Sequence, residues 1–152
     1  CICPESAVLR SLVTHLILGQ SDVVVMDMDA GVEHLGRGTA RGIDALIAVV
    51  EPGQRAIQTA NAIKKLAGDI GIDQFYVVGS KVTSEADRQY IAKSLPDCVI
   101  LGYLSLHPEI SEADRRGAGV FEAAPRAVEE MTEVKNRLQQ IQMEARGAQE
   151  SR

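Results

Sequence analysis

Residues 22–39 have the sequence DVVVMDMDAGVEHLGRGT and decide the fold class of this chain. The first seven residues are a short apolar, β-branched run that ends in acidic side chains, which is typical of a strand covered on both faces. The next eleven contain three glycines and predict a loop at the carboxyl end of that strand. Open α/β sheets bind their ligands at this end of their strands.

The rest of the chain alternates between strand and helix patterns. Strands are predicted at 44–50, 74–79 and 98–101. Helices are predicted from Pro4 to 18, from 54 to 70, from a Ser84–Asp87 capping box to 95, and from Pro125 onward. Parallel strands need crossover helices, so this order predicts an α/β fold with three α-β-α layers and a mostly parallel sheet. We expect one domain over 1–146, a frayed polar tail at 147–152, and a glycine-containing loop at 115–122.

Composition narrows the functional classes. The 152 residues carry a net charge of -5 with 16 Lys and Arg, which disfavours nucleic-acid binding. No apolar run is long enough to span a bilayer, and no signal peptide opens the sequence, so we expect a cytoplasmic protein. The last predicted helix has mixed charge, which argues against membrane attachment. Three cysteines make no disulfide framework.

The acidic strand end has a chemical interpretation. A carboxylate at Asp27 can hold a magnesium ion through water, and Gly31 lets the backbone approach a phosphate closely. The alternative is a solvated aspartate followed by a turn glycine.

Longer stretches resemble a known family. Asp27–Glu33 (DMDAGVE) resembles the switch II segment of MinD/ParA-type ATPases, and His34–Thr39 (HLGRGT) resembles the CooC-type proteins among them. Ala45–Gln58 (ALIAVVEPGQRAIQ) is similar to the next strand and loop of the family, and 102–120 to its region around the nucleotide base. The resemblance covers nearly the whole chain in the family's order and implies a partial P-loop NTPase fold of the SIMIBI type.

The resemblance implies an ATP-dependent homodimer. Asp27 would organise Mg²⁺, and Asp29 to Gly31 would sense the γ-phosphate of ATP and its loss in ADP. The adenine would lie between two pairs of residues, Ser80 with Lys81 and Leu104 with Ser105. The family commonly has Asn in place of Ser80 and Pro in place of Ser105, so base selectivity is open here, and either pair can instead be a plain turn.

The phosphate-binding loop is absent from the sequence. No G-x-x-x-x-G-K-[ST] motif or lysine-rich variant occurs in the 152 residues. In the family this loop follows a first strand and precedes a first helix, so we expect Cys1 to begin a fragment or a truncated gene product. Full-length family members hydrolyse ATP, and we expect this chain alone to be inactive in hydrolysis.

Cys1-Ile2-Cys3-Pro4 is a second distinctive motif. Two thiolates supply half of a tetrahedral site for zinc or a similar metal, and a two-fold dimer can supply the other half. CooC-type proteins have C-x-C followed by Pro before the corresponding helix, which implies Ni²⁺ or Zn²⁺ bound by Cys1 and Cys3 at a dimer interface. The alternative is two ordinary cysteines.

The function implied is a metallochaperone ATPase that inserts nickel into carbon monoxide dehydrogenase. A non-catalytic dimerisation or positioning protein of the MinD/ParA type is the alternative, and the C-x-C motif favours the first. Other candidates are weaker. Cys98 is expected in the core, His107 has no partner that the sequence reveals, and Glu129, Glu130 and Glu133 are expected on the solvated face of the last helix.

Overall fold

The computed structural model describes residues 23–28 and 43–150. Its elements are β1 (Leu46–Val50), α3 (Gln54–Asp69), β2 (Phe75–Val82), α4 (Glu85–Ser94), β3 (Val99–Ser105), α5 (Pro108–Arg116), α6 (Val120–Ala123) and α7 (Pro125–Glu150). The chain divides into two compact units. One contains 47–61 with 75–150, and the other contains 62–74 with the described residues before 47.

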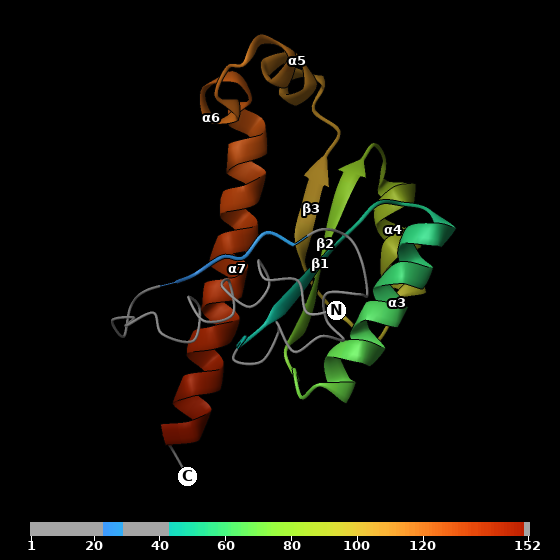
Figure 1. Ribbon diagram of the computed structural model, residues 1–152, viewed down its shortest axis with the longest axis vertical. Coiled ribbons are helices and arrows are strands. Elements are labelled where there is room, and N and C mark those ends of the chain that lie inside the picture. The colour runs from blue at the N-terminus through green and yellow to red at the C-terminus, as the bar shows by residue number, and fades with distance from the viewer. Residues whose placement is uncertain (1–22, 29–42, 151–152) are drawn as a thin grey trace, which may run out of the picture. The chain divides into compact units, whose positions relative to one another are not determined.

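The larger unit is layered around a parallel three-stranded sheet in the order β1-β2-β3 (Figure 1). α4 and the first turns of α3 cover one face, and α7 packs along β3 on the other. The short helices α5 and α6 follow the carboxyl end of β3. This arrangement confirms the predicted α/β fold. None of the helices within 43–150 is both long and apolar enough to cross a membrane.

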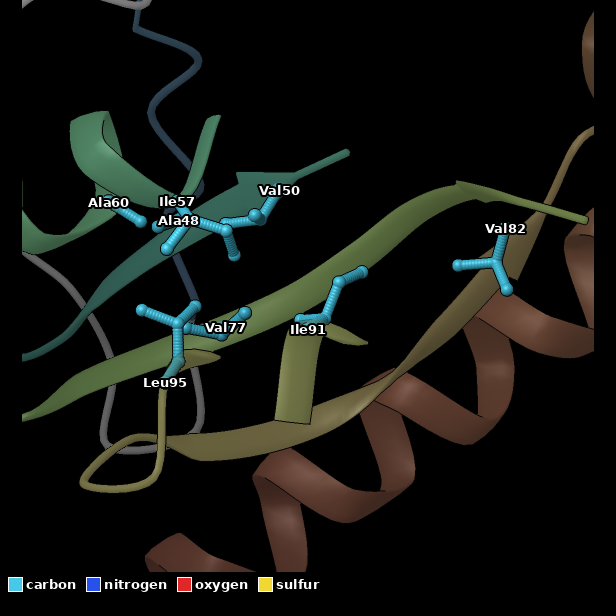
Figure 2. Packing of buried hydrophobic residues seen from close by; sticks show 8 residues of the cluster. All are labelled: Ala48, Val50, Ile57, Ala60, Val77, Val82, Ile91 and Leu95. Carbon is cyan, nitrogen blue, oxygen red and sulfur yellow. The ribbon is translucent and has the colours of Figure 1, made fainter. Parts of the chain in front are cut away.

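Apolar side chains between the sheet and the helices α3 and α4 form the main core of the larger unit. The buried members are Ala48, Val50, Ile57, Ala60, Val77, Val82, Ile91 and Leu95. Figure 2 shows Val77 of β2 facing Leu95 and Ile91, with Ala48 of β1 against Ile57 of α3. Alternate β1 residues point into this core, as the period of a strand requires.

The pairing of β2 with β3 is irregular at two points. Val77 pairs with Ile100 but Val78 pairs with Gly102, so Leu101 is an extra residue on β3. Gly79 pairs with Tyr103 and Val82 with Ser105, so Ser80 and Lys81 together lie opposite Leu104 alone. Such bulges bend a strand and leave backbone groups outside the ladder.

Two glycines permit close packing on opposite sides of this strand pair. A Cβ on Gly79 would overlap Cδ1 of the Tyr103 ring. A Cβ on Gly102 would lie 2.8 Å from Cγ2 of Val134 in α7. The side chains of Tyr103 and Val134 therefore occupy space that any larger residue at these positions would need.

The turn after α3 belongs to the smaller unit and confirms that the helix predicted over 54–70 ends before Gly71. Gly71 has φ 82°, in the left-handed region that favours glycine. The amide of Ile72 donates to the carbonyl of Ala67 at 2.9 Å, which closes the end of the helix.

Most predicted elements are confirmed, and β2 and β3 extend several residues beyond the predicted strands. The Ser84–Asp87 capping box is present, and Pro125 is the first residue of α7. That helix continues to Glu150, whereas a frayed tail was expected from Gly147. The domain boundary at 146 stays a prediction, and the helix expected after Pro4 lies outside the described residues.

Two expectations were wrong. The strand predicted at 22–28 is absent from its described part, 23–28, where Val23 and Val25 are 77% and 87% exposed. Apolar, β-branched composition makes a strand only where a neighbour pairs with it, and these exposed side chains show no such burial. In addition, α5 and α6 occupy much of the region expected to be irregular.

We expect Gly79→Ala to destabilise the protein by about 1–3 kcal/mol, because the new methyl group overlaps the Tyr103 ring in a packed layer. The midpoint of urea unfolding, followed by circular dichroism, measures this. Gly68→Ala is the matched control, since a Cβ there meets nothing within 4 Å. Alanine favours helix over glycine by about 0.5–1 kcal/mol, so the control should be neutral or stabilising. Equal midpoints for the two variants would contradict the close packing at Gly79.

Candidate functional site

The bulge at the carboxyl end of β2 brings together the residues predicted to contact a nucleotide base. Ser80 and Lys81 lie on β2 directly opposite Leu104 of β3, and Ser105 pairs with Val82 one step further on. All four are therefore neighbours at the end of the sheet where α/β proteins bind ligands. The sequence predicted these two pairs from the family resemblance, and the register places them side by side.

Lys81 has an uncommon backbone conformation. Its φ is 53°, in the left-handed region, and it is the one residue other than glycine with positive φ in the part of the chain described. Its Nζ lies 2.5 Å from Oε1 of Glu51, the residue after β1. Both side chains are more than half exposed, so this ion pair contributes little to stability. It does hold the Lys81 ammonium over the end of β1.

An open hollow adjoins the Glu51–Lys81 ion pair. Its volume is about 610 Å³, and it is lined by residues 51–56 and Lys81. Gly53 at the entry to α3 has nothing within 4 Å of where a Cβ would stand. The hollow thus lies at the carboxyl ends of both β1 and β2, next to the bulge.

A second polar group fixes the end of β3. The carboxylate of Glu130 in α7 accepts from the amide of Ser105 at 2.8 Å and from the hydroxyl of Ser105 at 2.6 Å. The Nε2 of His107 lies 2.9 Å from Oε2 of Glu130. The side chains of His107 and Glu130 are 11% and 23% exposed, so this network is largely shielded from water.

Burial and hydrogen bonding act in opposite directions on Glu130. Burial would raise the pKa of its carboxyl, but the hydrogen bonds from Ser105 and His107 favour the ionised form. The hydrogen bonds outweigh burial, and the pKa of Glu130 lies below its ordinary value. Glu130 therefore stays a carboxylate, and Nε2 of His107 donates to it.

The end of β2 is fixed independently by the start of α4. Oδ2 of Asp87 accepts from the amide and the hydroxyl of Thr83 at 2.8 and 2.7 Å, and from the amide of Ser84 at 3.1 Å. These bonds, above all that from the Thr83 hydroxyl, hold the pKa of Asp87 below its ordinary value. Asp87 thus fixes Thr83 and Ser84, the residues that follow β2, to the first turn of α4.

The structure corrects two expectations about α7 and the loop before α5. Glu130 was expected on the solvated face of the last helix, and His107 without a partner. They instead form one network with Ser105, because the face of α7 that packs on β3 includes Glu130. Ser105 was predicted to contact a base, but both of its hydrogen-bond donors are directed to Glu130.

Of the remaining predicted site residues, Asp27 alone lies within the described structure. Asp27 is described and exposed, but it follows a segment without regular secondary structure. Asp29, Gly31, Cys1 and Cys3 lie outside the described residues. Within 23–28 and 43–150, no three side chains among His, Cys, Asp and Glu gather as they would around a metal ion.

Sequence relatives support the same family that the motifs indicated. The chain is 37% identical over 125 residues to the carbon monoxide dehydrogenase accessory protein CooC of Rhodospirillum rubrum, a match covering 82% of this chain and 48% of that protein. It is also 37% identical over 120 residues to an uncharacterized ATP-binding protein of Methanocaldococcus jannaschii, which covers 77% of this chain and 46% of that one. The chain thus matches about half the length of these curated relatives. No protein-family model matches it.

Solved structures show the same fold. The MinD cell division protein of Aquifex aeolicus matches with a TM-score of 0.57 at 18% identity, over 66% of this chain and 46% of that one. MinD in the MinC:MinD complex of the same organism matches with a TM-score of 0.55 at 18% identity, over 63% and 43% of the two chains. These matches show that the chain has the fold of MinD, an α/β fold of the P-loop NTPase type.

By sequence, the chain is a homologue of CooC and of ATP-binding proteins of Methanocaldococcus jannaschii.

We expect Lys81→Gly to be more stable than Lys81→Ala by about 1 kcal/mol. Both changes remove the ammonium and its pairing with Glu51, but only glycine adopts φ 53° without a steric penalty. Chemical denaturation of the two variants measures the difference. If the alanine variant is the more stable one, the left-handed conformation of residue 81 is wrong.

We expect Glu130→Gln to lower the free energy of unfolding near neutral pH by about 1–3 kcal/mol, since three hydrogen bonds to a carboxylate are weakened. The pKa of Glu130 is lower in the folded state, so its contribution is present above the ordinary carboxyl pKa of 4.5 and is lost as pH falls through the folded value. The gap between wild type and variant should therefore narrow in acid.

Urea unfolding at a series of pH values measures that gap. Glu129→Gln is the matched control, because it makes the same change one residue away on the exposed side of α7. A gap that stays constant through the acid range would contradict the lowered pKa of Glu130.

Proposed function

We propose that the chain is part of an ATP-dependent metallochaperone that inserts nickel into carbon monoxide dehydrogenase. The observation that carries the proposal is the 37% identity to CooC, which extends over 82% of the chain. CooC is by name an accessory protein of that enzyme, and another relative is an ATP-binding protein. The parallel sheet and its flanking helices, shared with MinD, supply the matching scaffold.

The nucleotide base is assigned to the carboxyl ends of β2 and β3. The bulge at Ser80 and Lys81 opposite Leu104 supports this, because a bulge leaves backbone donors and acceptors outside the sheet ladder. Such groups can pair with the edge of a purine. The exposed hollow beside Lys81 gives a ligand access from solvent.

The phosphate end of the nucleotide is assigned to the segment after residue 26. Asp27 would hold Mg²⁺ through water, and Asp29 to Gly31 would respond to the γ-phosphate. Hydrolysis belongs to the whole protein, since the amides and lysine of a phosphate-binding loop are what neutralise the phosphates, and the 152 residues contain no such motif. ATP binding would supply the free energy that favours the closed dimer over the separate subunits.

The cargo metal is assigned to Cys1 and Cys3. Two copies of the C-x-C motif related by a two-fold axis offer four thiolates, enough for one tetrahedral Ni²⁺ or Zn²⁺. Nucleotide and metal would both bind the closed dimer more tightly than the separate subunits. Each should then increase the affinity for the other by the same factor.

The setting that follows from this function is a cytoplasmic homodimer with carbon monoxide dehydrogenase as its client. Membrane and nucleic acid play no part in the proposal. The helices of 43–150 include none that could span a bilayer, and the net charge of -5 is unfavourable for phosphate backbones.

We expect the chain to bind one Ni²⁺ or Zn²⁺ per two copies, because each copy supplies only half of a four-thiolate site. Equilibrium titration with either metal gives the stoichiometry, and analytical ultracentrifugation tests whether metal drives dimerisation. Cys1→Ser or Cys3→Ser should abolish both effects.

Cys98→Ala is the control, since Cys98 packs against the core of the larger unit and is expected to leave metal binding unchanged. Metal binding that survives both serine variants, or one metal bound per single chain, would contradict the intersubunit site. No binding by the wild-type chain would instead favour a MinD/ParA-like protein without a metal function.

A further inference from the structure

The residues at the carboxyl end of β3 are held by a helix distant in the sequence. Ser105 is the last residue of β3, and Glu130 follows it by 25 positions. One carboxylate accepts the Ser105 amide, the Ser105 hydroxyl and the His107 ring. Three donors from a three-residue turn thus converge on one side chain.

This convergence is not explained by the start of α5. His107 is the N-cap residue of that helix, but its side chain makes no capping hydrogen bond. The His107 ring is instead bonded to Glu130. Ser105 likewise commits its hydroxyl to Glu130, so neither side chain serves the helix that follows.

The turn held in this way forms one side of the proposed base site. Leu104 lies opposite the bulge at Ser80 and Lys81, and Ser105 follows it directly. The amide of Leu106 also donates to the carbonyl of Val82 at 3.0 Å, which ties the turn to the end of β2. A shift of 105–107 would therefore alter the gap between the two strand ends.

We propose that Glu130 is a positioning residue for the nucleotide base, an inference that rests on the nucleotide binding proposed above. Glu130 occupies both hydrogen-bond donors of Ser105 and keeps the 105–107 turn in place. Ser105 accordingly supports the site without contacting the base. The base is recognised by backbone groups at the bulge and at Leu104.

Substitutions at Glu130 and at Ser105 distinguish the roles of the two residues. Glu130→Gln weakens all three bonds and frees the turn. If the binding-competent arrangement falls to about a tenth of the population, apparent affinity for MgADP falls about tenfold. Ser105→Ala removes only the hydroxyl, keeps the bond from the amide to Glu130, and should change affinity less than about twofold.

Titration of the full chain with MgADP and with MgGDP, followed by amide shifts in NMR spectra, measures weak binding residue by residue. We expect shifts at 80–81 and 104–107 in the wild type. We expect Glu130→Gln to lose affinity for MgADP and to change the ratio of MgADP to MgGDP affinity. A loss of folded protein alone would lower both affinities equally and leave that ratio unchanged.

Glu129→Gln is the control and should bind both nucleotides as the wild type does. Equal affinities and ratios for Glu130→Gln and Glu129→Gln would overturn the role of Glu130 while leaving the nucleotide site standing. If Glu130→Gln does not fold, Ser105→Ala decides, because a tenfold loss there would make Ser105 a direct ligand. Absence of shifts in the wild type with either nucleotide would overturn the base site itself, and the inference with it.

Discussion

The pairing of β2 with β3 is the constraint on which the rest of the described structure depends. β2 is the central strand, and its buried Val77 faces α4. On the opposite face α7 approaches β3 so closely that Gly102 leaves no room for a side chain beside Val134. Because both faces are packed, the two strands cannot slide past each other without breaking a core layer.

Two irregularities in this pairing shape the candidate site at the carboxyl ends of β2 and β3. The extra residue at Leu101 shifts the register of β3, and the bulge at Ser80 and Lys81 shifts β2 in the compensating direction near its end. The left-handed conformation of Lys81 belongs to the same irregularity. Non-glycine residues persist in such conformations only where the surrounding structure holds them. Here the buried part of β2 precedes Lys81, and the hydrogen bonds from Thr83 to Asp87 follow it.

The sequence predicted the elements well where local patterns carry the information. Apolar runs indicated β1, β2 and β3, and hydroxyl and carboxyl groups three residues apart indicated the start of α4. α5 was missed although its signals are present, with Pro108 at its first turn and Gly117 at its end with φ 64°. Its nine residues are strongly polar, with few apolar side chains to mark a helical period.

The candidate site was only partly predictable. Family resemblance pointed to Ser80, Lys81, Leu104 and Ser105, and the strand register brings them together. The contact of Glu130 with Ser105 could not be predicted from sequence spacing, because 25 residues and two short helices separate the two residues. The valines at 23–25 show the opposite failure, since composition alone indicated a strand where the structure has none.

The position of Glu130 follows from the packing of α7 itself. Residues four apart lie on the same face of a helix, so Glu130 is one turn before Val134, the residue that contacts Gly102. Met131, the next residue along the helix, is 49% exposed and lies off this face. Ser105 is three residues beyond Gly102 along β3. Since Gly102 contacts Val134 and Ser105 contacts Glu130, α7 runs antiparallel to β3 here, and Glu130 lies at the carboxyl end of the strand. The contact that sets the distance between helix and sheet therefore also places a carboxylate at the strand end, where hydrogen bonds from three donors outweigh burial and keep it ionised.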